Sequence, residues 1–176
     1  MLMNNGGMTL MEVLAALLVL TLLVTAMGTG LNLAAKIQEE ALFASESAAL
    51  ADILQTALAD VLGFGADIRA EGESVRFSRG DYGLGDGQLV LADGLLCLRE
   101  PGGEPRPLVG EGAYSTMKIS QWKLHYIPQN SVETVTLLDG TAVTPLRGGL
   151  FYISFRIENP SGLCRDYETV VRLVNP

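Results

Sequence analysis

The sequence predicts an α+β protein in which one long N-terminal helix precedes a domain of antiparallel strands. Helix-forming residues run from about residue 8 to residue 62, with glycines only at Gly28 and Gly30. Beyond residue 65, short apolar runs alternate with Gly, Pro and Asp, which is typical of strands joined by turns. A helix followed by strands indicates an antiparallel sheet with the helix packed against it.

The composition supports a folded core and gives the chain an acidic balance. Of its 176 residues, 48% are hydrophobic, and 12 Lys and Arg stand against 20 Asp and Glu for a formal charge of -8. No broad positive field therefore attracts phosphate backbones, and we expect no direct nucleic-acid binding. A small local patch stays open, because basic residues are scattered singly through the domain: Arg69, Arg76, Arg79, Arg99 and Arg106.

The N-terminal apolar run is long enough to cross a membrane. Residues 13–27 are apolar apart from Thr21 and Thr25, and adding residues 8–11 gives about 20 residues, or roughly 30 Å of helix. Three alternatives fit this length: a cleaved secretory signal, a plain single-pass anchor, or a membrane helix with a special role. The first two leave Glu12 unexplained, although an acidic residue inside a membrane helix is costly.

The order of parts around Glu12 favours the third alternative. A short polar leader and Gly7 are followed by Met8-Thr9-Leu10-Met11-Glu12 and then by an unbroken apolar helix. This order resembles the type IV prepilin signature. The resemblance implies a cut after Gly7 by a prepilin peptidase, a mature N-terminus at Met8 that is N-methylated, and Glu12 as the carboxylate used in assembly.

The electrostatics of such a cut agree with the resemblance. Cutting before Met8 creates a charged amine about one helical turn from Glu12. An amine and a carboxylate attract strongly where the dielectric is low, and their pairing offsets much of the cost of burying either one. In the family the carboxylate pairs with the amine of a neighbouring subunit; from the residues alone, pairing within one chain stays equally open.

The resemblance also implies a domain organisation and a location. We expect a leader at 1–7, a membrane and filament-core half-helix at 8–30, an amphipathic half-helix at 31–65 and an extracytoplasmic β domain at 66–176. The N-terminus would be cytoplasmic in a single-pass membrane protein. The leader differs from the family in having no Lys or Arg, so we expect either a start upstream of Met1 or orientation by other means.

The second half of the helix carries an amphipathic stripe and ends at glycines. Small and apolar residues recur at spacings of three and four, and Gly63 and Gly65 are expected to end the helix. At Gly28 and Gly30, a bend or helix end competes with a weak point that stretches in a filament. The stripe comprises Ile37, Ala41, Ala44, Ala48, Ala51, Leu54, Leu58, Val61 and Leu62.

The strand pattern resembles minor pilins and the J-type pseudopilins of type II secretion. The resemblance is carried by the hairpin GQLVLADGLLCLRE, the strand WKLHYI and the closing FYISFRIENPSGLCRDYETVVRLVNP. The expected strands are Ser74 to Arg79, Gln88 to Leu91, Leu95 to Arg99, Lys118 to Ile127, Val132 to Leu137, Leu150 to Glu158 and Tyr167 to Val174.

Residue types that carry chemistry are sparse and scattered. Cys97 and Cys164 lack metal-ligand spacing, and they form either a disulfide or two unpaired thiols. His125, the single histidine, is expected on the surface of a strand. The stretch RGDYGLGDGQ, from Arg79 to Gln88, is a flexible loop or, less in keeping with its pattern, a calcium site using Asp81 and Asp86.

A structural role in a filament follows as the functional expectation, with no enzyme activity, cofactor or metal. The resemblance implies a minor subunit of a type IV pilus, competence pilus or type II secretion pseudopilus. Its partners would be the prepilin peptidase, other pilin or pseudopilin subunits through helix packing, and the inner-membrane assembly platform. The alternative is a membrane-anchored or signal-peptide-secreted binding domain without a filament role. The exposed stretch REPGGEPRP, 99–107, is a candidate contact loop.

Overall fold

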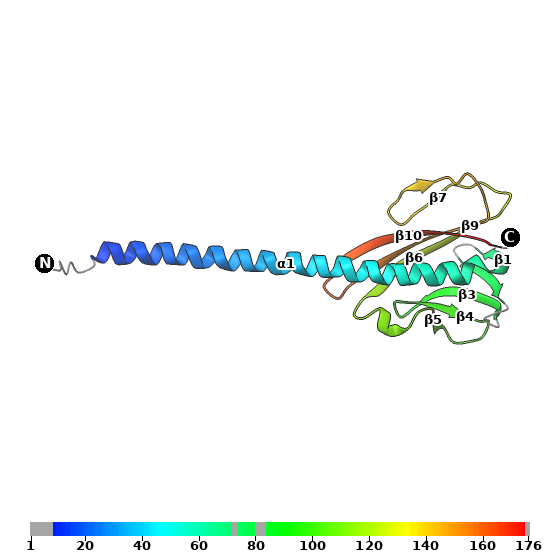
Figure 1. The fold of residues 1–176 in the computed structure, drawn as a ribbon, viewed down its shortest axis with the longest axis horizontal. Helices are drawn as coiled ribbons and strands as arrows, with labels where there is room; N and C mark the ends of the chain where they lie inside the picture. Colours follow the sequence, from blue (N-terminus) through cyan, green and yellow to red (C-terminus); the bar gives the residue numbers. More distant parts are fainter. Residues whose placement is uncertain (1–8, 72–73, 80–83, 175–176) are drawn as a thin grey trace. The chain divides into compact units, whose positions relative to one another are not determined.

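The computed structural model describes residues 9–71, 74–79 and 84–174, and it confirms the α+β class. Figure 1 shows one long helix followed by strands. The helices are α1 (Leu10–Gly63) and the short 3-10 helix η2 (Glu111–Ala113). The strands are β1 (Ala66–Glu71), β2 (Ser74–Arg79), β3 (Leu84–Ala92), β4 (Leu95–Arg99), β5 (Arg106–Pro107), β6 (Lys118–Ile127), β7 (Val135–Thr136), β8 (Ala142–Val143), β9 (Leu150–Glu158) and β10 (Cys164–Arg172).

The chain forms two compact units, Met1–Leu42 and Phe43–Pro176. In the described part of the first unit, the helix continues without a break through Gly28 and Gly30, so the alternative of a helix end at these glycines is wrong. A Cβ atom added at either glycine would meet nothing within 4 Å. Packing within this chain therefore does not require glycine at these two positions.

The second unit contains the strands, which pair in antiparallel fashion throughout. Sheet A has the order β1-β2-β3-β4-β5, sheet B the order β10-β9-β6, and β7 pairs with β8 alone. Four predicted strands match β2, β4, β6 and β9 at both ends. β7 has only two residues where a longer strand was expected, and β1, β5 and β8 were not predicted.

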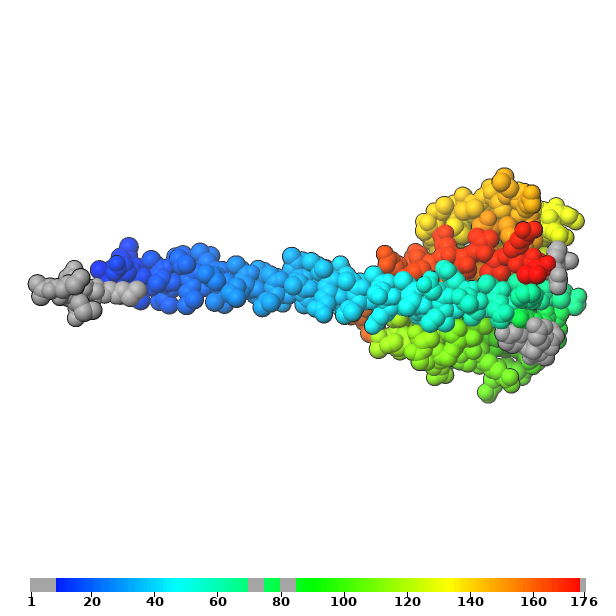
Figure 2. All heavy atoms as spheres, viewed as in Figure 1, coloured from blue at the N-terminus to red at the C-terminus, as the bar shows by residue number. Residues whose placement is uncertain are grey.

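The core of the second unit lies where the C-terminal half of α1 meets both sheets. Figure 2 shows this part of α1, in cyan, against the red atoms of β10 and the green atoms of sheet A. The buried residues of the helix recur every three or four positions, which places them on one side. They are Phe43, Ser47, Leu50, Ala51, Leu54, Leu58, Val61 and Leu62; sheet A adds Val75, Phe77, Leu89 and Leu96, and sheet B adds Ile119, Leu124, Phe151, Ile153, Phe155 and Ile157.

The predicted stripe is correct from Ala51 onward and shifted before it. Phe43, Ser47 and Leu50 are buried, whereas Ala44 and Ala48 are only half-buried. The shift arises because a phenylalanine and a leucine bury far more apolar area than alanines do. Large side chains therefore decide which side of the helix faces the sheets.

Polar contacts fix the helix against the edge strand β10. The hydroxyls of Ser47 and Tyr167 lie 2.7 Å apart, which satisfies the fully buried Ser47. The Gln55 side-chain amide donates to the backbone carbonyl of Glu168 at 3.2 Å. The second bond occupies a backbone carbonyl of β10 that an uncovered strand edge would leave without a partner.

The turn between β3 and β4 connects the two sheets. Asp93 and Gly94 both have positive φ, 51° and 78°, as a two-residue type I′ hairpin requires. The Gly94 carbonyl accepts a hydrogen bond from the Ile119 amide of β6 at 2.8 Å. A Cβ at Gly94 would stand 2.8 Å from the Lys118 Cβ, so glycine allows this close approach.

An ion pair between Arg156 and Asp166 lies on the side of sheet B away from the core. The two residues are directly opposite each other on β9 and β10, and the guanidinium donates twice to the carboxylate, at 2.6 and 2.8 Å. This hydrogen bonding by Arg156 lowers the pKa of the Asp166 carboxyl. Both side chains are half-buried, with 30% of the Arg156 and 26% of the Asp166 side chain exposed.

We expect Asp166→Asn to lower the free energy of unfolding at neutral pH and to change it little in acid. A depressed folded-state pKa adds stability above the unfolded value, about 3.9 for Asp, and this stability is lost as the pH falls through the folded pKa. Urea unfolding of the full chain in micelles, followed by the fluorescence of Trp122, measures the difference between pH 3 and 7. Asp52→Asn, at an exposed helix position, is the control. A difference that persists at low pH would contradict this assignment.

Candidate functional site

The start of α1 is organised by reciprocal hydrogen bonds between Thr9 and Glu12. The Glu12 carboxylate accepts from the Thr9 backbone amide at 2.7 Å and from the Thr9 hydroxyl at 3.0 Å. In return, the Glu12 amide donates to the Thr9 hydroxyl oxygen at 3.3 Å. Thr9 is the N-cap and Glu12 the third helical residue, so the pair forms a capping box.

The capping box gives Glu12 a use within its own chain. The first turn of any helix leaves four backbone N–H groups without helical partners, and in lipid an unsatisfied donor is costly. Thr9 and Glu12 each satisfy one such group. The sequence interpretation of Glu12 missed this role, although the spacing T-x-x-E before an apolar run is the signal that would have revealed it.

The helix that follows is long and apolar enough to cross a membrane, consistent with a single-pass anchor near the N-terminus. All described side chains from Thr9 to Leu42 are exposed within the single chain. The hydroxyls of Thr21, Thr25 and Thr29 donate back to carbonyls of the preceding turn, at 2.8 to 3.2 Å. These polar atoms are thereby satisfied without water, which suits a helix whose surroundings are hydrocarbon.

The expected cleavage residue Gly7 and the expected mature N-terminus Met8 lie outside the described residues. The described part of the proposed processing site begins at Thr9. There the Glu12 carboxylate lies in the first turn of α1, and its role in assembly stays a prediction.

The two cysteines are free thiols in the structure. Cys97 is buried on β4 of sheet A, and Cys164 is exposed at the start of β10 in sheet B. Burial raises the pKa of the Cys97 thiol, with a further contribution from Asp93. A raised pKa keeps Cys97 protonated and less reactive as a nucleophile. Of the two alternatives left by the sequence, this structure has the unpaired thiols.

His125 is half-buried on β6, partly covered by the segment around β7. It shares a small cavity with Thr134 and Leu137, and its Nε2 lies 3.6 Å from Glu133 Oε2. The prediction of a surface strand position thus holds only in part, because the β7 segment folds back over this side of sheet B. Among the described residues, no cluster of three or more His, Cys, Asp and Glu side chains could hold a metal ion.

The stretch from Arg79 to Gln88 differs from the expected loop. β3 begins at Leu84, so its second half is strand, and Asp81 lies outside the described residues. Asp86 pairs with the Arg76 guanidinium at 3.0 Å. The carboxylate that was considered for calcium is therefore held by an arginine of the neighbouring strand.

No protein-family model, no curated protein and no solved structure matches this chain. Its own residues are therefore the basis for a functional proposal. What they combine is a capped apolar helix near the N-terminus and, in the second unit, a helical segment packed on antiparallel sheets. This combination is compatible with a pilin-like architecture.

Proposed function

We propose that this chain is a prepilin-like structural subunit, assembled through its N-terminal helix into a pilus or pseudopilus. The main support for this proposal is the position of Glu12, which lies five residues beyond Gly7, in the first turn of an unbroken apolar helix. A carboxylate in an apolar helix is costly, and an assembling helix can use it as a register device between neighbouring subunits.

The proposal includes the path of the chain to the filament. It is inserted with its N-terminus in the cytoplasm, cut after Gly7 by a prepilin peptidase and N-methylated at Met8. Its α+β domain lies outside the membrane. Subunits then pack through the apolar surface of the helix, which the single chain leaves exposed from Leu10 to Leu42. The role is that of a minor subunit with no enzymatic step.

The apolar surface supports this role on energetic grounds. Large side chains along the helix, including Leu14, Leu18 and Leu22, are more than half exposed. Lipid covers such a surface while the subunit is in the membrane. Once the subunit leaves the bilayer, only other apolar surfaces can keep these side chains out of water, and neighbouring helices supply them.

A membrane-anchored binding domain without a filament role is the second candidate. The hydrogen bonds between Thr9 and Glu12 favour it, because they explain a glutamate at this position without any neighbouring subunit. The two candidates differ in what happens at Gly7.

We expect mass spectrometry of the mature protein to find an N-terminus at Met8 that carries one added methyl group. The sample is the full-length gene product, isolated from the membrane of cells that contain a prepilin peptidase. Gly7→Val is the control, and it should keep the uncut mass because the prepilin resemblance implies a cut after glycine. A mature chain that starts near Met27 would indicate a secretory signal, and an uncut wild-type chain a plain anchor. Either result would contradict the proposed processing.

A further inference from the structure

Strand register places three arginines and a glutamine side by side across sheet A. Arg69 of β1 lies opposite Arg76 of β2, Arg76 opposite Gln88 of β3, and Gln88 opposite Arg99 of β4. Directly opposite residues in antiparallel strands project to the same side, and neighbouring strands are about 4.8 Å apart. These four residues, named here the arginine row, therefore share one side of the sheet within roughly 15 Å.

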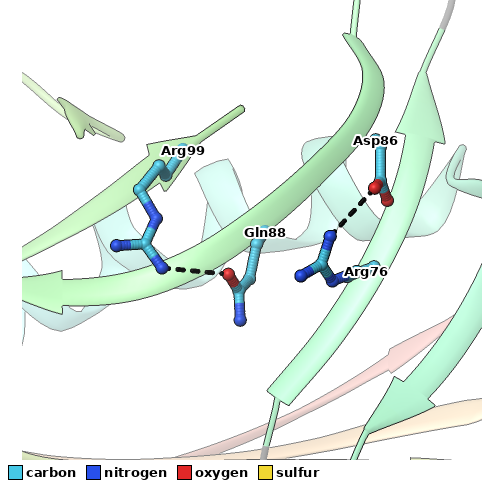
Figure 3. A network of polar contacts seen from close by, with 4 residues as sticks. All are labelled: Arg76, Asp86, Gln88 and Arg99. Atoms are coloured by element: carbon cyan, nitrogen blue, oxygen red, sulfur yellow. Dashed lines mark hydrogen bonds and ion pairs between the residues drawn. The ribbon is translucent and has the colours of Figure 1, made fainter. Parts of the chain in front are cut away.

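The arginine row lies on the side of sheet A that faces away from the core. Val75, Phe77 and Leu89 alternate with members of the row along the strands and are buried under α1. Arg76 and Gln88 are half-buried, and Arg69 and Arg99 are exposed. Figure 3 shows the side chains of Arg76, Gln88 and Arg99 standing on one side of their strands, together with Asp86.

The row brings like charges together at a cost to the fold. Arginines directly opposite each other in a sheet, as Arg69 and Arg76 are, repel and destabilise the pairing. Asp86 compensates the positive charge of Arg76, because its carboxylate oxygen Oδ2 lies 3.0 Å from the guanidinium nitrogen Nη1. Arg99 donates only to a neutral group, the Gln88 carbonyl oxygen at 3.2 Å. In the part of the chain that the structure describes, no carboxylate lies within ion-pair distance of Arg69 or Arg99.

A polar cavity adjoins the row and gives a ligand room to enter. Its volume is about 440 Å³, and Arg76, Asp86, Gln88 and Arg99 line it together with the turn 100–103. Within that turn, Gly102 has φ of +75°, and the Gly103 amide bonds back to the Glu100 carbonyl at 3.0 Å. This turn belongs to the candidate contact loop of residues 99–107. The proposed filament role assigns no function to this loop.

We propose that the arginine row and its cavity bind an acidic segment of a partner protein. A guanidinium group offers forked N–H donors that match a carboxylate bidentately. Arg69 and Arg99 flank the row, so a segment with two or more Glu or Asp side chains can pair with both ends at once. Binding of this kind supplies carboxylates to Arg69 and Arg99, whether or not the chain enters a filament.

The negative charge of the chain and of the cavity favours an acidic peptide over a nucleic acid as the ligand of the arginine row. The chain carries a formal charge of -8, and Asp86 and Glu100 stand at the cavity itself. A nucleic-acid duplex presents one negative charge about every 1.7 Å, so it would set phosphates against these carboxylates as well as against the arginines. A peptide carries discrete carboxylates, which can lie at Arg69 and Arg99 while uncharged residues face Asp86 and Glu100.

The test is calorimetric titration of the full chain, in micelles of an uncharged detergent, with an end-capped hexaglutamate peptide. We expect binding at low salt that weakens as salt is added, because exposed ion pairs are screened. The double variant Arg69→Gln/Arg99→Gln should bind at least about tenfold more weakly, a loss of roughly 1.4 kcal/mol. Arg147→Gln/Arg165→Gln changes the net charge equally at exposed positions elsewhere, and it should bind as the wild type does.

Three results would overturn the proposal. One is no binding of hexaglutamate at millimolar concentration, and another is an equal loss in the two double variants. The third is tighter binding of an oligothymidylate with six phosphates than of hexaglutamate, with the same dependence on Arg69 and Arg99, which would assign the row to nucleic acid. Trp122 fluorescence of each variant checks that the domain stays folded, and Arg69→Lys/Arg99→Lys, which keeps the charge, should recover part of the binding.

Discussion

Replacing Glu12 by alanine is expected to leave the cut after Gly7 intact and to reduce incorporation into filaments by about a hundredfold. Removing one partner of a buried ion pair costs about 3 kcal/mol or more, because the other charge stays buried without compensation. Each tenfold change in an equilibrium corresponds to about 1.4 kcal/mol. The measurement is the ratio of subunit in sheared filaments to subunit in membranes, by immunoblot, together with N-terminal mass spectrometry of the membrane fraction.

Two companion variants separate the charge of Glu12 from its capping role. Glu12→Gln keeps a side chain that completes a capping box but removes the negative charge. Thr9→Ala removes the cap, at a cost of about 1 kcal/mol to the helix, and keeps the charge. If the carboxylate pairs with an amine, Glu12→Gln fails as Glu12→Ala does, while Thr9→Ala still assembles.

The opposite pattern would show that capping is the whole role of Glu12. In that case Glu12→Gln would assemble normally, and Thr9→Ala and Glu12→Ala would be impaired to a similar degree. Normal incorporation of Glu12→Ala would exclude both roles. The capping box makes these controls necessary, since alanine at residue 12 removes a charge and a hydrogen-bond acceptor in one step.

Leu58→Ala is expected to destabilise the domain by about 2 to 5 kcal/mol, the range for a fully buried leucine. Leu58 has no exposed surface and lies in the core that α1 shares with both sheets. Removing three methyl-sized groups there loses apolar burial and leaves a cavity. Since a typical domain is stable by only about 5 to 15 kcal/mol, this loss removes a large fraction of the domain's stability.

Urea unfolding of the full chain in micelles, read by Trp122 fluorescence, measures this loss. Trp122 is the single tryptophan and packs against the same core. Ile53→Ala is the matched control, because Ile53 lies on the same helix but is 46% exposed. It should cost about 1 kcal/mol or less. A similar loss in both variants would mean that the buried stripe does not hold the helix to the sheets.

Structural features that depend only on residues adjacent in the sequence were predictable, because local interactions determine them. The length of the apolar run indicates a membrane-crossing helix without any knowledge of contacts. The signature from Gly7 to Glu12 is contiguous, and so is the capping box that was overlooked within it. β2, β4, β6 and β9 were found at their observed ends because turn residues bound them.

Features that depend on competition between side chains were predicted less well. Ala44 and Ala48 fit the helical spacing as well as Phe43 and Leu50 do, yet the larger pair is buried because it gains more on leaving water. β1, β5 and β8 were missed because each is held by a partner strand rather than by its own apolar pattern. Such segments form strands only when a neighbouring strand is available for backbone hydrogen bonding.

The sequence by itself determined the α+β class, the membrane-length helix and the place of Glu12, since each follows from the chain's own composition and spacing. Only the tertiary structure decided how distant residues meet. Arg69, Arg76 and Arg99 stand apart along the chain as single charges, and antiparallel register brings them into one row. The register between strands depends on which apolar side chains the whole core can bury. A local sequence pattern therefore cannot predict it.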